Sequence, residues 1–169
     1  LRPSNWRSRR TLEDELTTQG VVGIAGIDTR ALTRHLRERG AMRVGVFSGE
    51  AVTDEAAMLE RVTSAPEMAG SALAAQVSTS EAYVVSAKGD KRFTVAALDL
   101  GIKTMTPYRM AERGIEVHVL PASASLADIT AIDPDGVFFS NGPGDPAASE
   151  EAVALLTQVL DAGLPYFGI

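Results

Sequence analysis

The sequence predicts an α/β protein, because apolar, strand-like runs alternate with helical segments along its second half. Residues 93–100 form a near-continuous apolar run, which is typical of a parallel strand buried on both faces. Residues 137–140 form another and lead into a loop rich in glycine and proline, residues 140–146. This alternation predicts βαβ units with right-handed crossovers and a parallel sheet.

The first half is predicted to be mainly helical. Capping residues at the start and a glycine or proline at or beyond the end predict helices over residues 11–20, 29–39 and 54–62. Short apolar runs predict two strands, at residues 21–27 and 44–47. An alanine-rich stretch at residues 69–75 predicts a weaker helical turn.

A change in the pattern of apolar and polar residues along the chain predicts two domains. Residues 1–80 form the first, residues 81–92 are polar and contain a Gly-Asp pair typical of a linker, and residues 93–169 form the second. After its first strand, the second domain is predicted to continue with helices over residues 104–113, after Ser125 and over 149–162, and with strands over residues 116–120, 137–140 and 166–169.

Composition narrows the function. With 45% hydrophobic and 22% charged residues, the chain is an ordinary globular sequence, and its net charge of −6 argues against a nucleic-acid partner. No apolar run approaches the roughly 20 residues of a membrane span, and no signal-peptide core is present, so we expect a cytoplasmic protein. Without cysteine, and with only two histidines, the chain is predicted to hold no metal.

The loop at residues 140–146 is the strongest candidate site. Gly142 and Gly144 lack a Cβ, so a ligand can approach their backbone closely, while Pro143 and Pro146 restrict the loop. The loop follows the carboxyl end of a strand, where open α/β sheets bind ligands. A plain turn and a phosphate site are alternatives, but the loop matches no phosphate motif. Main-chain donors for an oxyanion or amide carbonyl fit the residues better.

Three segments of the second half, residues 95–103, 135–146 and 165–169, resemble the opening part of a class I glutamine amidotransferase domain. Residues 26–34 and 36–40 resemble the amino-terminal domain of the small subunit of carbamoyl phosphate synthase. The resemblance extends over nearly the whole chain. It implies part of that amino-terminal domain followed by the first βαβ units of a flavodoxin-like amidotransferase domain.

The resemblance also implies an activity. A cysteine directly after Ile169, assisted by a histidine and a glutamate further on, would release ammonia from glutamine through a thioester. Gly142 and Gly144 would bind glutamine through their backbones, and a further contact, a serine, would precede Leu1. The chain as given is therefore expected to be inactive by itself.

In the full protein, the ammonia would pass to a large synthetase subunit that uses ATP, magnesium and bicarbonate to make carbamoyl phosphate for arginine and pyrimidine synthesis. This subunit itself is expected to need no cofactor.

Two readings without catalysis remain open. One is a flavodoxin-like binding module that uses the 140–146 loop for an anion. The other is a module that docks the large subunit through a helix bearing Arg34 and Arg37. Three other polar residues near the site have simpler interpretations: Asp99 as a capping carboxylate, Lys103 as a solvated lysine, and Asp145 as a side chain bonded to its own loop.

Overall fold

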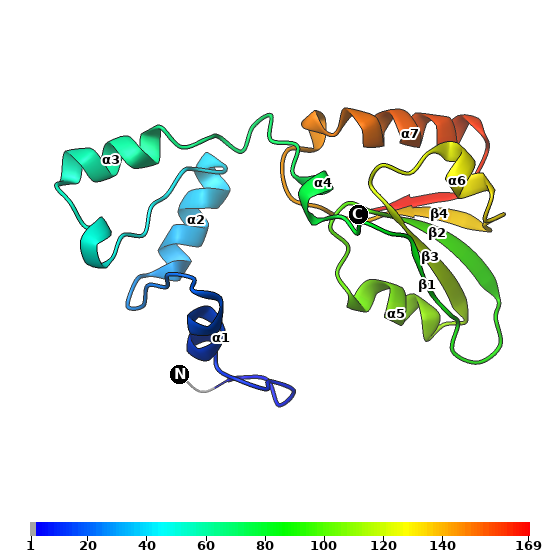
Figure 1. Cartoon of the computed structure of the whole chain (residues 1–169), viewed down its shortest axis with the longest axis horizontal. Coiled ribbons are helices and arrows are strands. Elements are labelled where there is room, and N and C mark those ends of the chain that lie inside the picture. The colour runs from blue at the N-terminus through cyan, green and yellow to red at the C-terminus, as the bar shows by residue number, and fades with distance from the viewer. Residues whose placement is uncertain (1–2) are drawn as a thin grey trace. The chain divides into compact units, whose positions relative to one another are not determined.

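The structure is a computed structural model that describes residues 3–169. It divides the chain into two compact units, a helical unit, Leu1–Glu67, and a sheet unit, Met68–Ile169 (Figure 1). The sequence places its domain boundary later, at the polar stretch 81–92, which here contains a strand of the sheet unit, β1 (Tyr83–Val85). With three residues, β1 is too short to show the alternation of apolar and polar side chains by which a strand is recognised in a sequence.

The helical unit contains α1 (Leu12–Gln19), α2 (Thr29–Arg39), the 3₁₀ turn η1 (Gly49–Ala51) and α3 (Glu55–Thr63). Each α-helix begins at a side chain that accepts a hydrogen bond from an otherwise unpaired N–H group of the first turn. These caps are Thr11, Asp28 and Asp54. The capping signals of the sequence therefore located all three helices.

The two strands predicted in this unit, at residues 21–27 and 44–47, are not formed. A strand persists only when a neighbour satisfies its N–H and C=O groups, and within residues 3–67 no strand is available to either segment. Their apolar side chains remain exposed to solvent: Ile24 is 60% exposed and Val44 is 66% exposed. No residue in this described range is buried.

The sheet unit has five strands in the order β1-β3-β2-β4-β5. Strands β2, β3, β4 and β5 are parallel, and β1 closes one edge by pairing antiparallel with β3. The bounds of the parallel strands are Phe93–Asp99 for β2, Ile115–Pro121 for β3, Gly136–Phe139 for β4 and Tyr166–Gly168 for β5. The predicted parallel sheet is confirmed, and β2 lies at its centre.

Helices cover both faces of the sheet (Figure 1). One face packs against α6 (Leu126–Thr130) and α7 (Glu150–Asp161) through a core that contains Leu98, Phe139 and Val159. The other face carries a smaller core around Ala97 and Phe138, and Met110 of α5 (Met105–Ala111) packs on it. Because both faces are covered, the side chains of β2 are apolar on both sides.

Aromatic pairs fix β5 against β4. The rings of Phe138 and Phe167 stack with centroids 6.0 Å apart, and those of Phe139 and Tyr166 meet edge to face at 5.4 Å. Such cross-strand pairs stabilise a sheet beyond the area that they bury. The register places Gly168 beside Phe139, so β4 and β5 end at the same edge.

Helix α6 gives a simple test of the capping signals. Ser125 accepts a hydrogen bond from the N–H of Asp128 and begins the helix, and the buried Ile129 ties the helix to the core. We expect Ser125→Ala to cost about 1 kcal/mol of stability and to lower the melting temperature by a few degrees, at roughly 2–8 °C per kcal/mol. Ser123→Ala, an exposed serine outside the helix, is the control. Equal melting temperatures of Ser125→Ala and Ser123→Ala would contradict the capping role of Ser125.

Candidate functional site

The candidate site lies at the carboxyl edge of the sheet unit, where β2, β4 and β5 end. A cavity of about 300 Å³ opens there. It is lined by residues 139–144 together with Leu100, Leu156, Tyr166 and Ile169. The sequence predicted a ligand-binding loop at this place, and the structure puts that loop in the wall of the cavity.

Ser140 joins the ends of the two central strands. Its side chain is 3% exposed, and its Oγ accepts a hydrogen bond of 3.0 Å from the N–H of Leu100. The same hydroxyl donates to the carbonyl of Asn141 at 2.9 Å. The start of the glycine loop is therefore held to the end of β2, and not only to its own strand.

Gly142 is required by close packing. A Cβ at this position would overlap the carbonyl oxygen of Leu100, which is backbone and cannot rotate away. Its φ lies outside the left-handed region, so conformation alone would allow another residue. Glycine is needed here because two backbone segments approach one another more closely than a side chain permits.

Gly144 is required for two reasons. Its φ of +95° is a conformation that residues with a side chain rarely adopt. A Cβ would also overlap the carbonyl oxygen of Ser71, and an isolated antiparallel bridge joins Gly144 to Ala72. Among residues 3–169, the N–H groups of Gly142 and Gly144 have no hydrogen-bond acceptor, which leaves both available to a ligand.

Asp145 is bonded to its own loop, as the sequence predicted, because its carboxylate accepts from the N–H of Ala147 at 3.0 Å. It also accepts from the N–H of Gly70 at 2.9 Å, a contact between distant parts of the chain that no sequence pattern predicts. These N–H groups, Gly70 first and Ala147 second, hold the pKa of Asp145 below its ordinary 3.8.

A depressed pKa means that the folded protein prefers the carboxylate of Asp145 more strongly than the unfolded chain does. Its stabilising contacts are therefore fully present above pH 3.8, and they are lost as the pH falls through the lower pKa of the folded state. The loop is held by a charged group throughout the neutral range.

Asp99, at the end of β2, is a buried anchor rather than a ligand group. Its carboxylate is 5% exposed and accepts from the N–H groups of Gly101, Ile102 and Thr79 at 2.9, 2.8 and 2.8 Å. It caps the backbone turn before α5, in line with the capping role expected from the sequence. Lys103 is exposed, as predicted.

The described residues supply binding groups rather than reacting ones. The chain has no cysteine, and no group of three His, Cys, Asp or Glu side chains within residues 3–169 could hold a metal ion. His118 lies in β3, and its Nε2 is 3.1 Å from the carboxylate of Glu116. Over the same residues, no helix is both long and apolar enough to cross a bilayer.

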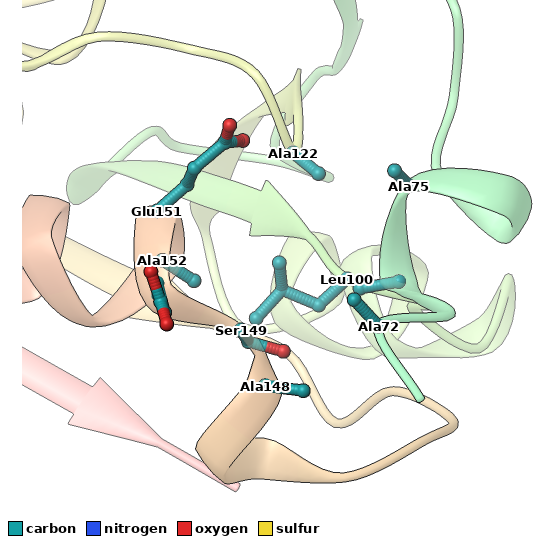
Figure 2. A pocket seen from close by; sticks show the side chains of 10 residues that line it. Ala72, Ala75, Leu100, Ala122, Ala148, Ser149, Glu151 and Ala152 are labelled. Carbon is teal, nitrogen blue, oxygen red and sulfur yellow. The ribbon is translucent and has the colours of Figure 1, made fainter. Parts of the chain in front are cut away.

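A second cavity, of about 370 Å³, lies beside the first at the beginning of α7. Figure 2 shows Ala72 and Ala75 on one side of it, Ala148, Ser149 and Ala152 on the other, and the side chain of Leu100 between them. Alanine side chains make most of its lining, so it offers space and few polar groups. No candidate residue of the sequence lies in it.

Two family models match the chain. Residues 1–46 match the carbamoyl-phosphate synthase small chain, CPSase domain, and residues 96–169 match glutamine amidotransferase class-I. The second match begins within β2 and contains β3 to β5 and the whole glycine loop. It agrees with the mixed α/β fold of the sheet unit, which is of the flavodoxin-like kind that the sequence predicted.

Curated relatives match along nearly the whole chain. The carbamoyl phosphate synthase small chain of Streptomyces coelicolor is 68% identical over 167 residues, which cover 99% of this chain and 44% of the relative. Those of Streptomyces avermitilis and Mycobacterium tuberculosis are 69% and 57% identical, over 99% of this chain and 44% and 46% of their own lengths. The chain thus spans less than half the length of the curated relatives that it matches.

Proposed function

Because this chain belongs to the carbamoyl phosphate synthase small-chain family, we propose that it is part of a subunit that hydrolyses glutamine and releases ammonia for carbamoyl phosphate synthesis. Gly142 and Gly144 would bind the glutamine. The reaction would be completed by residues of the full-length protein outside the 169 described by this sequence.

One observation carries the proposal: the glycine loop presents two unpaired main-chain N–H groups, Gly142 and Gly144, in the wall of a cavity. Glutamine offers carboxylate and amide oxygens, and both are hydrogen-bond acceptors. Donors held rigidly beside a reacting carbonyl stabilise the charge that develops on its oxygen during acyl transfer. The close packing of both glycines supplies that rigidity.

Strand β5 supports the place expected for the nucleophile. It runs parallel to β4, and the N–H of Ile169 donates to the carbonyl of Phe139 at 3.2 Å. Whatever follows Ile169 in the full-length protein therefore emerges at the edge where the glycine loop begins. A cysteine at that position would stand beside the 300 Å³ cavity.

The proposed chemistry has two steps. The cysteine thiolate attacks the carboxamide carbon of glutamine, the carbon–nitrogen bond breaks, and the nitrogen leaves as ammonia after it takes up a proton. Water then attacks the thioester, so glutamate leaves and the thiol is restored. The histidine and glutamate expected further along the full chain would move these protons.

The small-chain family implies a large synthetase subunit as the partner. We propose that it receives the ammonia and uses it with ATP, magnesium and bicarbonate to make carbamoyl phosphate, a precursor of arginine and pyrimidines. We propose that the two subunits form a heterodimer in the cytoplasm. The small subunit itself would need no cofactor.

The test is covalent labelling of the complete protein with an electrophilic glutamine analogue, followed by mass spectrometry. We expect one label, on a cysteine directly after Ile169, and we expect excess glutamine to prevent it. Absence of the label from a protein shown to be folded would overturn the proposal. That result would favour a flavodoxin-like module that binds through the same loop without catalysis.

A further inference from the structure

A short segment far from the glycine loop in the sequence lies directly against it. Residues 70–73, here called the brace, open the sheet unit and precede the short helix α4 (Ala74–Val77). Between the brace and the loop there are two hydrogen bonds and one antiparallel bridge: Gly70 N–H to the Asp145 carboxylate at 2.9 Å, Asp145 N–H to the Ser71 carbonyl at 2.9 Å, and Ala72 beside Gly144.

The chain just after the brace is tied to the same edge of the sheet. The N–H of Thr79 donates to the carboxylate of Asp99 at 2.8 Å, and Ser78 Oγ accepts from the N–H of Ala122 at 2.8 Å. The brace is therefore bonded directly to the glycine loop, and the chain that follows it, after α4, is bonded near the ends of β2 and β3. Figure 2 shows Ala72 of the brace facing the cavity beside Leu100.

We propose that Asp145 is a positioning residue for glutamine, because its carboxylate fastens the brace to the glycine loop and thereby holds the N–H of Gly144 in its binding position. The inference rests on the proposed function and deepens it. Before Gly142, the loop is fixed through Ser140, whose Oγ accepts from the N–H of Leu100, whereas at Gly144 the loop lies against the brace.

Asp145 suits this role better than its neighbours do. Among the described residues of the loop, it alone reaches the brace through both its backbone and its side chain: its N–H donates to Ser71, and its carboxylate oxygens accept from Gly70 and Ala147. The two prolines of the loop, Pro143 and Pro146, lack an N–H group and cannot donate such a hydrogen bond. Gly144, directly before Asp145, combines a left-handed φ with the bridge to Ala72, so the loop meets the brace in a conformation that few other residues adopt.

The experiment compares Asp145→Ala and Asp145→Asn in the complete protein. We expect Asp145→Ala to raise the KM for glutamine on the order of ten-fold and to leave kcat within about two-fold, because loop placement changes and the reacting groups do not. Asn keeps one carbonyl oxygen as an acceptor, so Asp145→Asn should restore part of the affinity. Asp161→Ala, an exposed carboxylate at the end of α7, is the control and should change neither constant.

A second measurement is independent of catalysis. Hydrogen exchange with mass spectrometry should show faster exchange in Asp145→Ala for peptides that contain residues 70–73 and 144–147, and unchanged exchange in β2 and β3. A variant that failed to fold would exchange quickly everywhere, which would attribute any loss of activity to unfolding and overturn the specific positioning role.

The outcomes separate the two proposals. If the wild-type protein hydrolyses glutamine and Asp145→Ala has an unchanged KM, the positioning role is wrong while the proposed function stands. If the brace peptides exchange at the wild-type rate, the brace does not depend on Asp145, and the inference fails for that reason. If the folded wild-type protein shows no glutamine hydrolysis, the proposed function fails and the positioning role fails with it.

Discussion

Gly142→Ala is expected to lower kcat/KM for glutamine hydrolysis by about a hundred-fold, the loss that a misplacement of about 1 Å produces in an active site. The new Cβ would overlap the backbone carbonyl of Leu100, so the loop must move before the residue fits. That movement turns the N–H of Gly142 away from the cavity. A steady-state glutaminase assay of the complete protein measures the effect.

The matched control is Gly136→Ala. Both glycines have φ values outside the left-handed region, so neither substitution strains the backbone itself. A Cβ at Gly136 would meet the Pro165 carbonyl oxygen at 3.4 Å, an ordinary contact. Near wild-type activity in Gly136→Ala beside a large loss in Gly142→Ala is the expected pair of results. Full activity in both variants would remove the close approach to Leu100 from the binding mechanism.

Asp99→Ala is expected to cost on the order of 3 kcal/mol of stability in the sheet unit. The carboxylate is 5% exposed and accepts three backbone N–H groups, which the substitution would leave without a partner. A buried N–H that loses its acceptor costs about 1–3 kcal/mol, and part of the loss is recovered where the turn relaxes toward water. The expected cost is therefore closer to that of one or two lost bonds than of three.

Native-state hydrogen exchange measures this cost as the free energy of opening for amides in β2 and β3. Asp161→Ala removes an exposed carboxylate and should leave that free energy unchanged. Asp99→Asn should fall between them, because its carbonyl oxygen can still accept from Gly101 and Ile102 while its NH₂ group faces the N–H of Thr79. Equal protection in Asp99→Ala and Asp161→Ala would show that Asp99 does not anchor the edge.

The sheet unit could be predicted from sequence because its strands are buried on both faces. From β2 onward, the continuous apolar runs of β2 and β4 and the glycine stops between elements located its strands and helices to within a few residues. The helical turn predicted at residues 69–75 was placed too early, since α4 begins at Ala74. β1 was missed, since only Val85 of its three residues is buried and nothing in so short a segment alternates. The predictions of strands at residues 21–27 and 44–47 were wrong, because a run of apolar residues does not by itself provide a neighbouring strand to pair with.

The candidate site, too, could be predicted only in part from the sequence. Gly142 and Gly144 could be singled out because glycine beside proline is a local signal of close backbone approach. The neighbours that they approach could not, since the Leu100 and Ser71 carbonyls come from elements 42 and 73 residues earlier in the chain. Main-chain atoms are the same in every residue, so no side-chain pattern announces them. For that reason the hydrogen bond from the N–H of Gly70 to the carboxylate of Asp145 could not be predicted.

The contact between Gly142 and residue 100 has a consequence for how this loop can change over evolution. Gly142 is confined by a backbone carbonyl, which position 100 would present with almost any side chain. Position 100 is therefore free to vary in size and shape as far as this contact is concerned, whereas position 142 has no acceptable substitute. A compensating second mutation at residue 100 cannot rescue a change at 142. Randomising both positions together and selecting for growth should return glycine alone at 142, whichever residue stands at 100.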